Sequence, residues 1–109
     1  MEANDYQAAA RKTAIYTKIP NSMFYPYLGL AGETGEVCEK VKKIIRDKNG
    51  VFSPEDTLAI KKELSDVCWY VANIAADLNL TLDDVFQCNI DKLKDRESRG
   101  VLQGSGDNR

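Results

Sequence analysis

The sequence predicts an all-α protein, a four-helix bundle completed by homo-oligomerisation. Apolar residues recur at helical spacing in four segments, and no segment shows the alternation of a strand. One segment, Val67–Ala76, carries no charge over nearly three helical turns. A helix that is apolar around most of its circumference needs neighbours on several sides. Because 109 residues can barely surround such a helix, we expect a homodimer or a homotetramer.

The first two helices are predicted from their apolar residues and their end signals. The first covers roughly residues 4–18, and an uncharged loop containing Pro20 follows it. The second begins near Pro26, which suits the first turn of a helix, and continues to about Lys48. Asn49 and Gly50 then provide a left-handed C-cap.

The third helix has the clearest start signal in the chain. Ser53 can cap this helix, and Pro54 suits its first position. Glu55 and Asp56 favour the positive end of the helix dipole. The helix is expected to run to about Leu78.

Thr81 is the expected cap of a fourth helix that ends near Ser98. The remaining residues, 100–109, contain three glycines and no apolar periodicity. The sequence therefore divides into a helical domain, residues 1–99, and a flexible C-terminal tail, residues 100–109.

Composition excludes several classes of protein. The chain has no histidine, which rules out Ser-His-Asp and Cys-His catalysis and zinc sites built on histidine. Its net charge of −2 argues against a nucleic-acid polymer as partner. Charged residues interrupt the N-terminus, and no apolar run approaches the length of a membrane span. We therefore expect a cytoplasmic protein with no membrane partner.

The three cysteines, Cys38, Cys68 and Cys88, form no CxxC pair and are odd in number. All three fall in helical segments rich in apolar residues. We expect them to be small core residues that stay reduced.

Two pairs of acidic residues at positions i and i+3 form the strongest candidate site. The pairs are Glu33 with Glu36 and Glu63 with Asp66, and on a helix both members of a pair point the same way. If the two helices lie side by side, four carboxylates converge and repel one another unless cations separate them. Oxygen ligands suit Mg²⁺, with Mn²⁺ as a possible substitute, and such ions often carry phosphate substrates.

Another interpretation of these acids stays open at the level of spacing. Charged residues on helix flanks are usually solvated, and Glu36 with Lys40 is a favourable i, i+4 pair. Spacing alone does not separate a metal centre from a solvated helix surface.

The fourth helix carries a second polar group of interest. Asn89 falls inside its apolar face, where a buried amide needs a hydrogen-bond partner. Lys92 and Arg96 follow along the same side. The three side chains are candidates to hold a polyphosphate against the metals. Alternatively, Asn89 bonds a neighbouring backbone group and the two cations are solvated.

From Tyr27 to Arg99 the sequence resembles the MazG-like all-α nucleoside triphosphate pyrophosphohydrolases. The resemblance rests on GLAGETGEVCEKVKK, KKELSDVCWYVANIA and NIDKLKDRESRG, at residues 29–43, 61–75 and 89–100. Two ExxE/D pairs on consecutive helices are the metal signature of that family. Gly32 stands where the family often has an additional glutamate, which favours the compact single-domain branch similar to dCTP pyrophosphatases. Glu97 and Ser98 replace an aromatic-proline pair, so contacts to the base are not carried over there.

This resemblance implies Mg²⁺-dependent hydrolysis of a nucleoside triphosphate, with a deoxynucleotide favoured, to the monophosphate and pyrophosphate. It implies metal binding by Glu33, Glu36, Glu63 and Asp66. The implied catalytic residues are Glu36, as acceptor of a proton from water, together with Glu63, Lys92 and Arg96. The implied substrate-binding residues are Asn89, Lys92, Arg96, Lys43, Tyr70 and Phe24.

Two rival functions remain at this level. A phosphoribosyl-ATP pyrophosphohydrolase uses similar acids on a related bundle. A non-catalytic helical interaction module would carry the same acids as ordinary surface residues.

Overall fold

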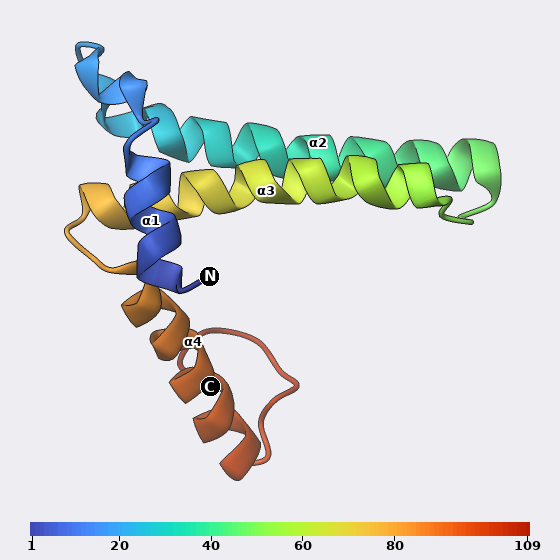
Figure 1. Ribbon diagram of the computed structural model, residues 1–109. Helices are drawn as coiled ribbons and strands as arrows, with labels where there is room; N and C mark the ends of the chain where they lie inside the picture. Colours follow the sequence, from blue (N-terminus) through green and yellow to red (C-terminus); the bar gives the residue numbers. More distant parts are fainter.

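The computed structural model describes all 109 residues, and it contains helices and no strands (Figure 1). The elements in chain order are α1 Ala3–Arg11, the short 3₁₀ turns η1 Ile15–Lys18 and η2 Ser22–Phe24, α2 Tyr25–Lys48, α3 Pro54–Asp77 and α4 Leu82–Ser98. The prediction of an all-α chain with four helices is confirmed. None of these helices combines the length and the hydrophobicity that crossing a membrane requires.

The first helix is shorter than predicted, because it ends at Arg11 and a 3₁₀ turn follows. The hydroxyl of Thr13 donates to the Ala10 carbonyl at 2.7 Å, and that of Thr17 donates to the Ala14 carbonyl at 2.8 Å. Threonine side chains that bond to nearby carbonyls compete with the helical ladder. The indole N–H of Trp69 also donates to Thr13 Oγ1 at 2.8 Å, which fixes the turn against α3.

Helices α2 and α3 form a long antiparallel hairpin that dominates the molecule (Figure 1). Asn49 and Gly50 both have positive φ at the end of α2, as their sequence predicts. At the start of α3, the Asp56 amide donates to Ser53 Oγ at 3.1 Å, and the Ser53 amide donates to Asp56 Oδ2 at 3.0 Å. This reciprocal capping box confirms the predicted start of the third helix.

Helix α1 crosses α3 and completes a small core. Ala10, Ala72 and Leu82 form its buried centre, and Tyr6 and Trp69 pack against them. Helices α2, α1 and α4 all pack on α3. These contacts explain why its segment Val67–Ala76 carries no charge.

A polar network lies beside this core and joins α1 and η1 to α3. Arg11 pairs with Asp77 at 2.6 Å, and the Tyr16 hydroxyl donates to the other oxygen of Asp77 at 2.8 Å. Buried Asn73 accepts from Arg11 at 3.3 Å and donates to the Trp69 carbonyl at 3.1 Å. Every buried polar side-chain atom of the chain has a partner, so this network stabilises the crossing of α1 over α3.

The bundle is not closed within one chain, because α4 diverges from the hairpin (Figure 1). The radius of gyration is 16.9 Å, whereas a compact domain of this length has about 13 Å. The accessible surface is 8021 Å², against about 6000 Å² for a compact monomer of this mass. The predicted apolar face of α4 is buried only at Leu82, and Phe86, Ile90 and Leu93 are exposed. Completion of the bundle by a second copy stays a prediction.

The three cysteines differ from the sequence interpretation, since Cys38, Cys68 and Cys88 are all exposed and free in the single chain. Helical spacing placed them next to apolar residues. Only the arrangement of neighbouring helices decides whether that side of a helix is covered.

The C-terminal residues form no helix but turn back along α4 (Figure 1). The Arg109 guanidinium donates to the carbonyls of Val101 at 3.0 Å, Leu102 at 2.9 Å and Gly106 at 2.7 Å. These bonds hold the tail in a closed loop. Its flexibility in solution stays a prediction.

Candidate metal centre

The antiparallel pairing of α2 and α3 brings three carboxylates together from two helices. Glu33 of α2 and Glu63 and Asp66 of α3 each offer an oxygen, and these oxygens all lie within 4.8 Å of one another. Glu33 and Glu63 are half-buried, and Asp66 is exposed. The i, i+3 spacing of Glu63 and Asp66 puts both on the side of α3 that faces Glu33.

The electrostatics of this cluster favour a cation. Partial burial raises the pKa of Glu33, and its hydrogen bond with Glu63 and the charges of Asp66, Glu63 and Glu36 raise it further. Burial and the neighbouring negative charges both disfavour the ionised form of Glu33, and a bound cation would offset both effects. Three hard oxygen donors on two helices are the ligand type that Mg²⁺ and Mn²⁺ prefer, so these residues fit a divalent cation.

Glu36, the fourth predicted acid, lies outside the convergent set. It is exposed, although its charge is close enough to contribute to the raised pKa of Glu33. The sequence could not separate these two residues, because both belong to one pair on one helix face. Which of them faces α3 depends on how the two helices pack.

Lys40 contacts the acid cluster on α3 and not its predicted partner on α2. Lys40 Nζ lies 3.5 Å from Glu63 Oε1 across the hairpin, whereas the i, i+4 spacing paired Lys40 with Glu36. In this arrangement Lys40 partly offsets the charge of the acid cluster. The signal for its role is its position one turn beyond Glu36, on the side of α2 that faces α3.

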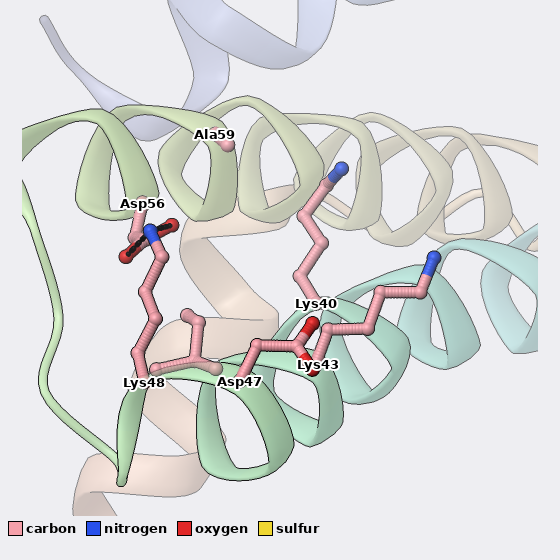
Figure 2. Close-up of a pocket in the computed structure, with 7 residues that line it drawn as sticks. Lys40, Lys43, Asp47, Lys48, Asp56 and Ala59 are labelled. Atoms are coloured by element: carbon pink, nitrogen blue, oxygen red, sulfur yellow. Dashed lines mark hydrogen bonds and ion pairs between the residues drawn. The ribbon is translucent and has the colours of Figure 1, made fainter.

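Lys43 lies beyond Lys40 in a hollow of about 210 Å³ near the end of the hairpin. Figure 2 shows the Lys40 side chain extending from α2 toward α3, whereas the Lys43 side chain extends along α2, away from Lys48 and Asp56. Lys48 and Asp56 form an ion pair of 2.8 Å at the other side of the hollow. The hollow therefore connects the acid cluster, through Lys40, to a second cation that has no ion-pair partner.

Tyr70, a substrate-binding residue in the implied site, lies close enough to Glu33 and Asp66 to feel their charges; its role in binding stays a prediction. Burial raises the pKa of the Tyr70 phenol, and nearby Tyr25, Glu33 and Asp66 raise it further. The Tyr70 ring also packs edge-to-face on Trp69, with 5.0 Å between ring centroids.

Phe24 and Trp69 occupy different environments from Tyr70. Phe24 stands at the start of the hairpin with a largely exposed side chain. Trp69 packs against the core cluster, which agrees with a core role.

The polar residues of α4 are not brought to the acid cluster of the same chain. The C-terminal half of α4, which carries Lys92 and Arg96, extends away from the hairpin (Figure 1). Both side chains instead contact Asp107 of the tail. Asn89 is exposed and makes no side-chain hydrogen bond, so the buried amide inferred from the sequence is absent in the single chain.

The structure also contains an apolar hollow beside α3 that no sequence pattern predicts. It measures about 590 Å³ and lies where α1, α3 and α4 meet, lined by residues that include Tyr6, Cys68, Val71, Leu82 and Phe86. The divergence of α4 leaves this surface uncovered.

Comparison with known proteins adds two findings. A family model described as the MazG nucleotide pyrophosphohydrolase domain matches residues 26–101. The chain is also 47% identical, over 114 aligned residues, to the Gene 37 protein of Mycobacterium phage L5, and the similarity spans the whole of both chains. No solved structure matches the sequence.

Proposed function

The chain belongs to the MazG nucleotide pyrophosphohydrolase family, and from that premise we propose that it hydrolyses a nucleoside triphosphate to the monophosphate and pyrophosphate. The proposed cofactor is Mg²⁺, with Mn²⁺ as a substitute, and the favoured substrate is a deoxynucleotide. The observation that carries this proposal is the convergence of Glu33, Glu63 and Asp66 between α2 and α3.

The three convergent carboxylates would hold the divalent cation. When bound, that cation neutralises charge on the triphosphate and makes an attacking water more acidic. Glu36 is exposed next to the cluster, and we assign it as acceptor of the water's proton. Lys40, whose Nζ lies 3.5 Å from Glu63 Oε1, is a further cation available to a phosphate oxygen of the substrate.

Substrate phosphates need cations, and we assign this task to Lys92 and Arg96, with Asn89 as an amide donor and Lys43 as a further cation. Since α4 points away from the hairpin of its own chain, we propose that α4 of a second copy supplies these groups. The surface in excess of a compact monomer is about 2000 Å² per chain, or about 4000 Å² for two chains, which lies within the range of about 2000–5000 Å² that obligate homodimers bury. The exposed apolar residues of α4 and the hollow beside Phe86 are the surfaces that a homodimer or homotetramer would cover.

The decisive experiment measures pyrophosphate release from each canonical ribonucleotide and deoxynucleotide, and from phosphoribosyl-ATP, with and without Mg²⁺. Asp66→Asn and Glu63→Gln should lower the rate at least about a hundredfold, since metal coordination supplies several kcal/mol of transition-state stabilisation. Mg²⁺ should also raise the melting temperature of the wild type and of neither variant.

Glu39→Gln is the matched control for this experiment. Glu39 is an exposed acid on α2 that pairs with Lys42 at 2.8 Å and lies outside the cluster. Its rate should stay near that of the wild type. Normal turnover in Asp66→Asn would contradict the metal assignment, and hydrolysis of phosphoribosyl-ATP alone would identify the rival enzyme.

A further inference from the structure

The C-terminal tail covers the two cations of α4. Asp107 Oδ1 lies 3.3 Å from Lys92 Nζ and 3.4 Å from a terminal nitrogen of Arg96. The same nitrogen of Arg96 donates to the Asp107 carbonyl at 3.0 Å. One carboxylate therefore sits between the two side chains that the proposed function assigns to substrate phosphates.

The two cations differ in exposure, since the Lys92 side chain is 37% exposed and that of Arg96 is nearly buried. The Arg96 side chain is only 8% exposed, whereas that of Asp107 is 83% exposed. Lys92, and to a smaller extent Arg96, lowers the pKa of Asp107, so the carboxylate is ionised at neutral pH. Because Asp107 is exposed, its ion pairs at these distances are weak and exchangeable.

The tail returns to α4 because its backbone bends twice at glycine. Gly104 has a φ of 137° and Gly106 a φ of 82°, conformations that other residues rarely adopt. The Arg109 guanidinium closes the loop through three carbonyls, and Arg99, the residue that follows α4, donates to the Arg109 carbonyl. This loop presents Asp107 to Lys92 and Arg96 without any apolar anchor deep in the fold.

We propose that the Asp107 carboxylate occupies the position of a substrate phosphate between Lys92 and Arg96, so that the C-terminal tail competes with the triphosphate for this subsite. A phosphate offers more negative charge and more acceptor oxygens than a carboxylate, and it can therefore displace Asp107. The closed tail lowers the apparent affinity for nucleotide by the fraction of molecules that hold it closed. This inference rests on the proposed function, since it names how that site is regulated.

The test compares the KM of the full-length wild type with that of Asp107→Asn, using the best nucleotide substrate. Removing the competing charge should lower KM about threefold, the size expected from the loss of one exposed ion pair, and should leave kcat near the wild-type value. Asp91→Asn is the matched control. Asp91 is an exposed acid of α4, the helix that carries Lys92 and Arg96, and its side chain accepts a hydrogen bond from Gln87 at 2.8 Å. Its KM should not fall.

A second measurement does not depend on turnover. Amide hydrogen exchange of residues 101–109 in the full-length protein should become faster when tripolyphosphate binds. Tripolyphosphate should also bind Asp107→Asn more tightly than the wild type in calorimetry. An unchanged or raised KM in Asp107→Asn, or a tail protected by tripolyphosphate, would overturn the proposal. If the wild type hydrolyses no nucleotide, the proposed function fails, and the exchange and calorimetry results still decide whether the tail competes for the anion.

Discussion

Three side chains define the candidate site at the scale of single residues. Glu33, Glu63 and Asp66 share a small volume between α2 and α3, whereas Glu36 stays exposed at its edge. The pattern of two acid pairs predicts which residues are candidates. It does not predict which of the four converge, because that depends on the rotation of each helix about its own axis when the two pack.

Gly29 gives a sharp prediction about the same region. A Cβ at this position would lie 2.1 Å from the Tyr70 ring, whereas a Cβ at Gly32 would meet nothing within 4 Å. Alanine favours a helix by about 1 kcal/mol over glycine, but forcing an added methyl group into packed surroundings typically costs about 1–3 kcal/mol. In urea unfolding, Gly29→Ala should therefore be less stable than the wild type, while Gly32→Ala should be more stable.

The fluorescence of Trp69 provides the accompanying readout. The Tyr70 ring packs edge-to-face on Trp69, so displacement of Tyr70 should change the emission in Gly29→Ala and not in Gly32→Ala. Equal stability of the two variants would mean that Tyr70 is not held against Gly29.

At the scale of elements, local capping determines where helices begin and end. The Ser53–Asp56 capping box and the Asn49–Gly50 turn define the hairpin connection from residues adjacent in sequence. The end of α1 at Arg11 was not predicted. It depends on the Trp69 indole, which comes from another helix and fixes Thr13.

The start of α3 should show a specific dependence on acid. Hydrogen bonds from Lys48, and to a smaller extent from Ser53, lower the pKa of Asp56 from 3.8 to about 2. A carboxyl group whose pKa is lower in the folded state stabilises the fold above its unfolded pKa, and this contribution is lost as pH falls. The melting temperature of Asp56→Asn should therefore lie below that of the wild type at pH 7, and the difference should shrink between about pH 4 and pH 2.

Glu55→Gln is the control for this pH dependence. Glu55 lies in the same first turn of α3 and forms no ion pair. Its difference from the wild type should vary much less over the same pH range. A constant difference for Asp56→Asn down to pH 2 would contradict the assigned role of the Lys48 contact.

At the scale of the whole molecule, one chain exposes more surface than a compact domain of the same mass. Ten of its 109 residues are buried, and beyond Leu82 the apolar face of α4 leaves Phe86, Ile90 and Leu93 exposed. An open monomer of this kind gains stability by burying apolar surface against a second copy. In the proposed function, such an association brings the cations of one chain to the acids of the other.

Subunit mixing tests this division of the site between chains. Asp66→Asn removes a metal ligand, and Lys92→Ala removes a phosphate contact, so each variant alone should be poorly active. In a randomly mixed dimer, half of the molecules are heterodimers with one intact site, which should restore about a quarter of wild-type activity. Activity measured after the two variants are refolded together gives the result.

A mixture of Asp66→Asn with Glu63→Gln serves as control, because both substitutions affect the same metal centre and no intact site can form. Recovery in that control, or none in the first mixture, would show that the acids and cations do not act across subunits. Light scattering should give a mass that is a multiple of the chain mass at micromolar concentration.

The sequence by itself determined the fold class, the boundaries of α2, α3 and α4, and the candidate residues of the site. Helical periodicity, caps and acid spacing are local properties, encoded by residues a few positions apart. Only the tertiary structure decided that Glu36 lies outside the convergent acids and that Lys40 contacts Glu63. It also decided that the cysteines are exposed and that Asp107 contacts Lys92 and Arg96. Each of these outcomes depends on how whole helices and the tail are placed relative to one another. That placement is fixed by packing between residues far apart in the chain, which no short stretch of sequence encodes.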